Sequence, residues 1–501
     1  MMISRFLFLV VFLTFTACAV GPDYKRPSVA VPAAYKEASP EAVKTLAKAE
    51  PKDSADRGKW WEVFGDAELN KLEEQIATSN QTVKAAEASF RQARALVAEA
   101  RAAYFPTVGL DASATRNSIG TGAGHTSGST LGGVIYNSYG TSLEASWVPD
   151  LWGKVRRQVE SSKATAAASA AEMASVRLSA QGELAIDYLD LRIADEQKRL
   201  LDRTVEAYKE SVMITENQYK SGVASESDVL QAKVQLETTE AQDVDVGVAR
   251  AEYEHAIALL VGKAPADFSI AVVDNVPGLP SIPSGVPSEL LERRPDVAAA
   301  ERNVAAANAQ IGVAESAYFP NVTLAADGGY TGSKLEHLFT LPDRFWSIGP
   351  SLVETIFDAG LRSAQTESAI ASYDQTVANY RQTTLAAFQE VEDNLAALRI
   401  YEQEAGILET TVKDANESVA VFLNQYKAGI VNYTSVVTAQ TAALTDELTQ
   451  LTVRKERLNA AAMLIENLGG GWNASELNKS YVTQGKTTPF SILPPSVGKR
   501  D

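Results

Sequence analysis

The sequence predicts a mixed α and β fold: a membrane β-barrel, with four strands per chain and twelve per trimer, continued by a long antiparallel coiled-coil α-helical barrel. Three observations predict this fold. The hydrophobic period changes between seven and two along the chain, this change occurs twice in the same order, and very long stretches contain no proline. The repetition indicates a tandem internal duplication of one long unit.

The first 17 residues are predicted to form a signal peptide. Arg5 is followed by an apolar run from Phe6 to Phe15, which is too short to span a bilayer as a helix. Thr16 and Ala17 then precede Cys18, the only cysteine of the chain. A cysteine at the cleavage point is typical of a bacterial lipoprotein, so we expect lipid attachment at Cys18. The alternative is an ordinary signal peptide with an incidental cysteine.

Composition excludes several classes of protein. The chain has 501 residues, a formal net charge of −17 and a pI near 4.9, which argues against a nucleic acid partner because such binding depends on Lys and Arg contacts to phosphate. The three histidines are far apart in sequence, so no metal site is predicted. The chain has no nucleophile elbow and no Walker loop, so we predict neither enzymatic activity nor a cofactor. After the signal peptide no apolar stretch reaches about 18 residues, and no transmembrane helix is expected.

Each copy of the repeat begins with heptads. The apolar positions of the first copy are Val83, Phe90 and Val97 with Ala86, Ala93 and Ala100, and those of the second are Val297, Val304 and Ile311 with Ala300, Ala307 and Ala314. This spacing is typical of the a and d positions of coiled-coil helices. Each heptad stretch ends at a Tyr-Phe-Pro sequence, at Pro106 and at Pro320.

Alternating strands follow each of these prolines. The apolar residues are Val108, Leu110, Ala112 and Ala114; Leu143, Ala145 and Trp147; Val322, Leu324 and Ala326; and Trp346, Ile348 and Leu352. Small polar residues stand between them, as lumen-facing residues would between lipid-facing ones. Aromatic residues gather at the strand ends, where a membrane interface favours them. Pro350 interrupts the last strand and predicts a bulge. The alternative is a soluble sandwich with the apolar face in its core.

Long helical hairpins complete each copy. The proline-free segments Lys154 to Lys220 and Leu361 to Lys427 would each reach roughly 100 Å as a helix. Each ends at a glycine-containing turn and is followed by a return helix, Ser227 to Leu260 or Tyr433 to Leu468. We therefore expect a signal peptide (1–17), a lipid-anchored N-terminal segment (18–65), a first repeat (66–262), a linker (263–287), a second repeat (288–468) and a C-terminal tail (469–501).

The strand count predicts the assembly. Four spanning strands cannot close a barrel, and an open sheet edge is not tolerated in lipid. Two copies would give eight strands, whose interior side chains just fill, whereas three copies would give twelve strands around a pore. A trimer is therefore expected.

Several short motifs now indicate a family. They are Cys18 to Tyr24, Trp60-Trp61, Asp150 to Gly153, Arg293 to Asp296, both Tyr-Phe-Pro repeats, Phe357 to Gly360 and both Tyr-Lys-x-Gly turns. In their order and spacing the chain resembles the TolC-type outer-membrane efflux proteins, in particular the lipoprotein branch that serves resistance-nodulation-division drug-efflux pumps. The resemblance covers nearly the whole mature chain. Residue 19 is Ala rather than Asp, which by resemblance to lipoprotein sorting rules also indicates the outer membrane.

The resemblance implies a homotrimeric passive conduit in the outer membrane, exporting drugs or other small molecules. Its partners would be a periplasmic adaptor (membrane fusion) protein, an inner-membrane proton-driven efflux transporter and outer-membrane lipid. Metal-ion efflux and type I protein secretion are alternatives within the same class. A structural or adhesive coiled-coil lipoprotein is the alternative from another class, because it would keep the heptads but need no alternating strands.

Two groups of candidate residues follow. The expected adaptor-docking turns comprise Tyr219, Lys220, Gly222 and Val223, and Tyr426, Lys427, Gly429 and Ile430; both glycines are placed to take positive φ as helix C-caps. The expected periplasmic gate comprises Tyr433, Thr434, Ser435 and Thr438, with Glu226 and Asp228 as a possible acidic ring.

The gate prediction departs from the family pattern. Ser435 and Thr438 stand where resembling proteins often carry acidic residues, so a constriction of hydroxyls with Tyr433 is expected instead. Thr434, Thr438, Thr441 and Thr445 share one helix face. The alternative is that this stripe packs in a helix seam beside Val437 and Leu444.

Overall fold

The computed structural model describes residues 19–37, 59–119, 134–273, 276–280 and 293–472. The chain divides into two compact units, which are described separately. Unit 1 comprises Met1–Pro27, Arg91–Ala167 and Glu301–Asn379, and unit 2 comprises Ser28–Phe90, Ala168–Ala300 and Tyr380–Asp501.

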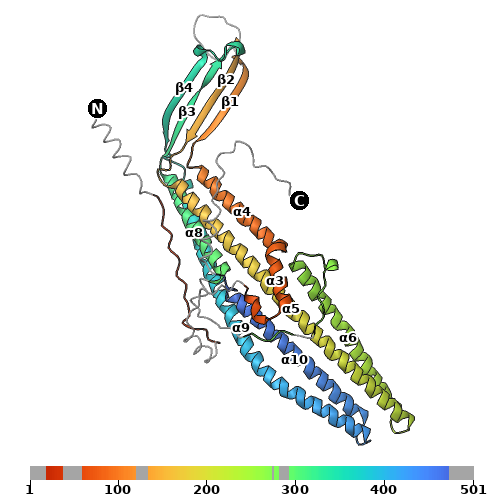
Figure 1. The fold of residues 1–501 in the computed structure, drawn as a ribbon. Helices are drawn as coiled ribbons and strands as arrows, with labels where there is room; N and C mark the ends of the chain where they lie inside the picture. Colours follow the sequence, from red (N-terminus) through yellow and green to blue (C-terminus); the bar gives the residue numbers. More distant parts are fainter. Residues whose placement is uncertain (1–18, 38–58, 120–133, 274–275, 281–292, 473–501) are drawn as a thin grey trace. The chain divides into compact units, whose positions relative to one another are not determined.

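Unit 1 contains an antiparallel sheet of four strands in the order β1-β2-β3-β4 (Figure 1). The strands are β1 (Thr107–Ile119), β2 (Val134–Trp147), β3 (Asn321–Gly332) and β4 (Arg344–Val353). Each is longer than the stretch over which the sequence alternates. Among the described strands β1 and β4 are the edges of the sheet, so each presents one row of backbone groups without a neighbouring strand from that part of the chain.

The register gives the sheet one apolar and one polar face, as predicted. Leu110 pairs with Leu143, and Ala326 pairs with both Ala145 and Ile348. Leu110 and Ile348 are 75% and 73% exposed, so the apolar face is not part of a core formed by the described residues. This exposure argues against a soluble sandwich. The opposite face carries Asp111 and Ser113 on β1, Ser142, Glu144 and Ser146 on β2, Thr323 and Asp327 on β3, and Ser347 and Ser351 on β4.

The bulge predicted at Pro350 is wrong. The pairing of β3 with β4 runs without interruption from Asn321 opposite Val353 to Tyr330 opposite Arg344, and Pro350 lies opposite Leu324. Proline lacks only the backbone N–H, and an edge strand such as β4 tolerates that loss without a change of register.

The long helices begin and end where the sequence predicts. Helix α5 (Lys154–Lys220) and helix α9 (Leu361–Lys427) each have 67 residues. The return helices α6 (Glu226–Leu260) and α10 (Tyr433–Asn467) differ from their predicted bounds by one residue. The heptad segments form α4 (Gln81–Ala102) and α8 (Pro295–Glu315). None of the helices in the described part of the chain is both long and apolar enough to cross a membrane.

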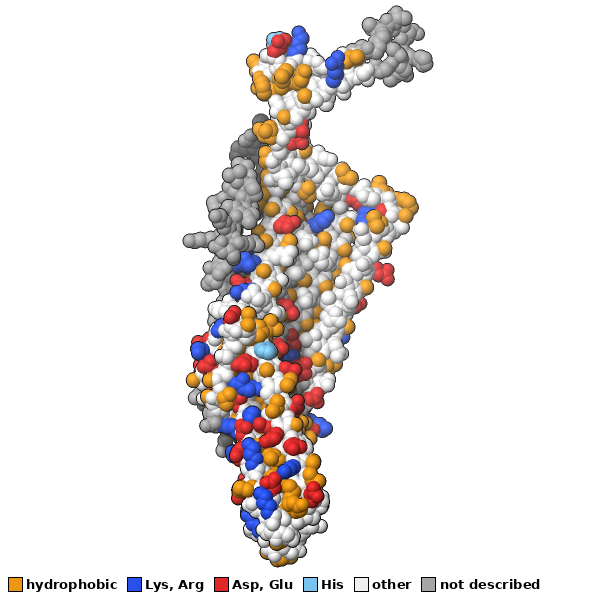
Figure 2. Space-filling view, turned by 90° about the vertical axis from the view of Figure 1, so that its right-hand side faces the viewer, with side chains coloured by type: hydrophobic (Ala, Val, Ile, Leu, Met, Phe, Trp, Pro, Cys, Tyr) orange, Lys and Arg blue, Asp and Glu red, His pale blue; other side chains and the backbone are white. Residues whose placement is uncertain are grey.

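Unit 2 has a hydrophobic core in which the N-terminal segment takes part. The short 3₁₀ helix η2 (Trp60–Phe64) and helix α3 (Ala67–Ser79) pack with residues of α5, α6 and α10. The largest side chains of this core include Trp60, Trp61, Phe64, Leu69, Leu72, Ile76, Leu184, Tyr188, Leu191 and Ile257. Charged residues of both signs are interspersed over the exposed faces of the helices (Figure 2).

Candidate functional site

The two glycine turns have the same backbone geometry. After α5, Gly222 has a φ of 75° and its N–H donates to the Tyr219 carbonyl at 2.9 Å. After α9, Gly429 has a φ of 72° and donates to the Tyr426 carbonyl at 2.9 Å. Positive φ at the C′ position is the usual way to end a helix with glycine, and the expected conformation is confirmed at both turns.

The side chains of the two turns differ. Val223 and Ile430 are 69% and 72% exposed, and Tyr219 is also exposed. Tyr426 is buried instead, with its ring edge against Tyr433 at a centroid distance of 5.1 Å. Tyr426 is therefore a packing residue, which the likeness of the two turn sequences did not reveal.

Helix α6 begins with a capping box that uses one of the acidic gate candidates. The Ser225 hydroxyl accepts from the Asp228 N–H at 3.3 Å, and the Asp228 carboxylate accepts from the Ser225 N–H at 3.1 Å. This reciprocal pair satisfies two backbone donors at the start of the helix. Asp228 therefore has a structural role, whereas Glu226 is exposed in the same first turn.

The threonine stripe lies on an exposed face of α10. Thr434, Thr438, Thr441 and Thr445 are all exposed, whereas Leu444 is buried. Within the described residues the stripe is thus not the buried helix seam that was the alternative.

Two members of the stripe bond to the neighbouring return helix. Thr434 donates to the Gln231 side chain at 3.1 Å and Thr441 to the Gln235 side chain at 3.4 Å, so hydroxyls of α10 meet amides of α6. Thr438 donates instead within its own helix, to the Thr434 carbonyl at 2.9 Å. The sequence reasoning missed both glutamines, although their spacing of four residues places them on one face of α6.

The Tyr433 side chain is only 1% exposed. It packs with Ala232, Tyr426 and Val436 in a small core, and burial raises the pKa of its hydroxyl to about 12. Its ring therefore lies behind the exposed stripe, whereas Ser435 at the start of α10 bonds to the capping residue Asn432.

In unit 1 the residues that directly follow Cys18 form a clamped strap, defined here as Ala19–Tyr24. The Val20 N–H donates to the Trp152 carbonyl at 3.1 Å. The buried Arg157 guanidinium donates to the carbonyls of Val20 and Gly21, at 3.2 and 3.0 Å, and to Asp23 at 2.9 Å. Cys18 itself lies outside the described residues. The sequence reasoning missed Arg157 because its partners are more than a hundred residues away.

Gly21 allows the strap to lie directly on a helix. It has a φ of 98°, and a Cβ at this position would come within 2.4 Å of the Gly312 Cα on α8. Asn308, one turn earlier on the same helix, donates to the Pro22 carbonyl at 2.9 Å. The strap therefore has one fixed path on unit 1.

Aromatic residues cluster where β2 ends and β3 begins. Trp152 stacks on Phe319 with a centroid distance of 5.0 Å, and its Nε1 donates to the Pro320 carbonyl at 2.8 Å. Trp147 at the end of β2 donates to the Tyr104 carbonyl at 3.0 Å. Such amphipathic side chains suit the interface between lipid and water. In the described ranges no group of three or more His, Cys, Asp or Glu side chains could hold a metal ion.

A sheet with an exposed apolar face, combined with long helical hairpins, defines the class of outer-membrane channel proteins. Residues 72–263 and 286–470 match the family model described as outer membrane efflux protein, and the chain belongs to this family. The family is one of efflux channels, and its members reside in the outer membrane.

Individual proteins extend the similarity over almost the whole chain. The chain is 29% identical to the toluene efflux pump outer membrane protein TtgI of Pseudomonas putida, over 92% of this chain and 96% of that protein. It is 29% identical to the outer membrane protein OprJ of Pseudomonas aeruginosa, over 93% and 95%. The solved structure of the outer-membrane channel OprN superposes with a TM-score of 0.82 at 31% identity, covering 91% of this chain and 100% of that one.

Proposed function

We propose that three copies of the chain form a passive conduit of a tripartite efflux system that exports drugs or other small organic molecules. The observation that carries this proposal is the open sheet with an exposed apolar face and two unpaired edges, β1 and β4. Lipid does not tolerate such edges, and three copies pairing β4 with the next β1 would close a barrel of twelve strands. The names of relatives such as the toluene efflux pump protein support small organic cargo.

The partners of this conduit would be a periplasmic adaptor protein and an inner-membrane proton-driven transporter. The two turns, Tyr219–Val223 and Tyr426–Ile430, are the proposed docking surfaces for the adaptor. Exposure of Val223 and Ile430 supports this role, because an exposed aliphatic side chain beside a lysine offers both apolar and charged contact. Site-specific crosslinking of the adaptor to each turn tests the assignment.

Conductance tests the central proposal. Purified trimers in planar lipid bilayers are expected to form stable ion-conducting channels. A structural coiled-coil lipoprotein would give no conductance, and a conducting monomer would contradict the shared barrel.

Charge on the apolar face is expected to prevent insertion in a position-dependent way. Leu110→Lys should cost more than Leu324→Lys, up to about 2–4 kcal/mol, because Leu110 pairs with Leu143 inside β2, whereas Leu324 pairs with Trp147, the last residue of β2. Ser113→Lys on the polar face of β1 is the matched control and should be tolerated. Urea unfolding of the barrel in lipid vesicles measures the three values. Equal costs at Leu110 and Ser113 would contradict the assignment of the two faces.

Cys18 is the proposed site of lipid attachment. Clamping of the strap that follows it, at the aromatic end of the sheet, supports this assignment because the anchor would then meet the membrane at its interface. One acyl chain alone binds a membrane weakly, so several acyl chains would anchor the protein together with the β-barrel.

The proposed gate is a constriction formed by the hydroxyls of the threonine stripe and Ser435, with Tyr433 supporting the helix from behind. Thr434–Gln231 and Thr441–Gln235 join α10 to α6. Hydrogen bonds of this kind contribute about 1 kcal/mol each, so three protomers could hold a closed but releasable state. Glu226 and Asp228 would supply a negative ring in the alternative, electrostatic gate.

Double threonine variants distinguish the hydroxyl gate from the electrostatic gate. Thr434→Ala/Thr441→Ala removes both bonds to α6 and is expected to raise closed-state conductance and vancomycin entry into cells. Thr449→Ala/Thr452→Ala is the matched control, since these two hydroxyls lie outside the stripe and donate to carbonyls of α10 itself, and their loss should leave both readouts unchanged. If Glu226→Ala/Asp228→Ala alone opens the channel, the gate is electrostatic and the hydroxyl constriction is wrong.

A further inference from the structure

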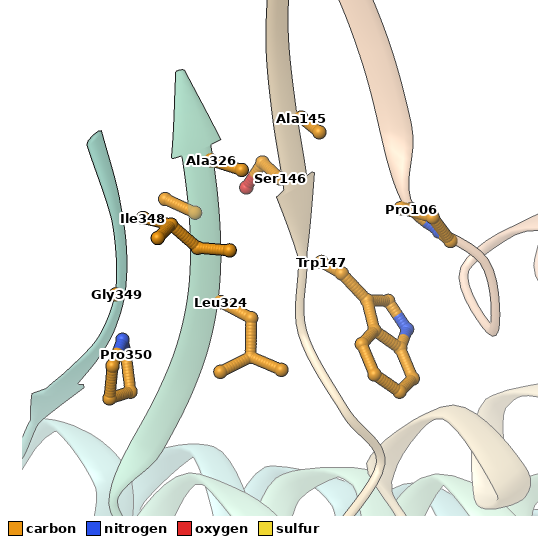
Figure 3. A pocket seen from close by; sticks show the side chains of 10 residues that line it. Pro106, Ala145, Ser146, Trp147, Leu324, Ala326, Ile348, Gly349 and Pro350 are labelled. Atoms are coloured by element: carbon orange, nitrogen blue, oxygen red, sulfur yellow. The ribbon is translucent and has the colours of Figure 1, made fainter. Parts of the chain in front are cut away.

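An apolar groove crosses the base of the sheet on its apolar face. It has a volume of about 220 Å³ and is lined on that face by Trp147, Leu324, Ile348 and Pro350. Leu324 lies between Pro350 and the Trp147 indole, and Ala326 also lines the groove (Figure 3). The lining is almost entirely carbon, so the groove suits an apolar occupant.

The walls of the groove are fixed before anything binds. The Trp147 indole is held by its hydrogen bond to the Tyr104 carbonyl, and Pro106 and Pro350 contribute rigid rings. A preformed apolar groove binds at little ordering cost. Isolated apolar side chains on a lipid-facing sheet would form no such hollow.

The start of the clamped strap is linked, within the same unit, to the strand β3 that lines this groove. Val20 bonds to Trp152, and Trp152 bonds to Pro320, the residue before β3. Leu324 in the groove is four residues further along that strand, roughly 13 Å at the usual rise. Cys18 directly precedes the strap, so an acyl chain attached to it would start from a segment that is tied through Trp152 to the base of β3.

We propose that the groove binds one acyl chain carried by Cys18 of the same chain. This inference rests on the proposed lipid attachment and adds a binding site for the lipid on the protein. Arg157 would act as a positioning residue, because it holds the strap that directly follows Cys18. The anchor would then be bound along the β-sheet itself and would not move freely in the membrane.

Photocrosslinking of the lipid tests this site. Cells that express the full chain are fed a fatty acid carrying a diazirine and an alkyne, the trimers are purified and irradiated, and crosslinked peptides are identified by mass spectrometry. A crosslink between the Cys18 lipid and peptides containing Trp147, Leu324 or Ile348 is expected. A labelled Cys18 whose lipid crosslinks only elsewhere would overturn the groove proposal and leave lipid attachment intact.

Variants identify the source of the bound acyl chain and the place where it binds. In Cys18→Ser the groove crosslink should disappear; if it persists, the occupant is a free membrane lipid and the proposal is wrong. Ala326→Phe fills the groove and should weaken the crosslink about tenfold, equivalent to one or two methylene groups. Ala112→Phe, on β1 but on the same face of the sheet and outside the groove, should leave the crosslink unchanged. No label on wild-type Cys18 would instead disprove lipid attachment.

Discussion

Asp195→Ala is expected to lower the free energy of unfolding by about 3–5 kcal/mol, because it removes the shared partner of one buried and one partly buried guanidinium group. The Asp195 and Arg192 side chains are almost fully buried on α5. Asp195 accepts from Arg192 at 3.2 Å and from Arg250 of α6 at 2.7 Å. Without this carboxylate the buried Arg192 and the partly buried Arg250 each have one acceptor fewer.

The same cluster holds the segment that follows the first repeat. Arg192 donates to the Ala271 carbonyl and Arg250 to the Ile270 carbonyl, both at 2.8 Å. Arg192 also donates to the Tyr188 hydroxyl, which donates to Asp66, the N-cap of α3. Loss of Asp195 should therefore also increase backbone hydrogen exchange around residues 270 and 271.

An exposed ion pair on the same helix is the control. Asp202→Ala removes one of the two carboxylate partners of Lys198, the other being Asp243. The Lys198 and Asp202 side chains are both exposed, and exposed pairs contribute little. Guanidinium unfolding of the trimer in detergent measures both variants. A similar small effect for Asp195→Ala and Asp202→Ala would contradict the assigned weight of the buried cluster.

The second large effect concerns pH: titration of the buried Glu73 carboxyl is expected to lower the free energy of unfolding as pH rises. The Glu73 side chain is 0% exposed on α3, and neither carboxylate oxygen has a hydrogen-bond partner among the described residues. Burial raises the pKa of this carboxyl from 4.5 to about 9, although the charge of Arg177 opposes the shift. Between these two values the unfolded chain releases the proton and the folded protein keeps it. The free energy of unfolding therefore falls as pH rises, by up to about 1.4 kcal/mol per unit.

Glu73→Gln removes this titration. Relative to the wild type its stability should increase by about 1 kcal/mol for each pH unit between pH 5 and pH 9. The comparison must be made against the wild type, because burial also raises the pKa of Asp187 and of Glu466 to about 7. Glu74→Gln is the neighbouring control; it breaks the exposed ion pair with Lys59 and should show no such gain. A Glu73→Gln difference that does not change with pH would show that the carboxyl is ionised in the fold.

The long helices, the alternating strands and the duplication could all be predicted from the amino-acid sequence. Prolines and glycines interrupt the chain at the ends of α5 and α9, and these signals are local, so the bounds of both helices could be predicted to the residue. The apolar and polar faces of the sheet also follow from an alternation visible in each strand. Family resemblance then identified the class of channel, which the comparisons confirmed.

Only the tertiary structure decided which side chains in these elements meet. The two turn tyrosines occupy equivalent positions, yet Tyr426 is buried against Tyr433 while Tyr219 is exposed. Glu73 follows Leu69 and precedes Ile76 on the buried face of α3, where periodicity favours an apolar residue. Bonds such as Thr434 to Gln231 and Arg157 to Gly21 join residues more than a hundred positions apart. Local periodicity determines which face a residue occupies, but the packing of distant segments determines what that face contacts.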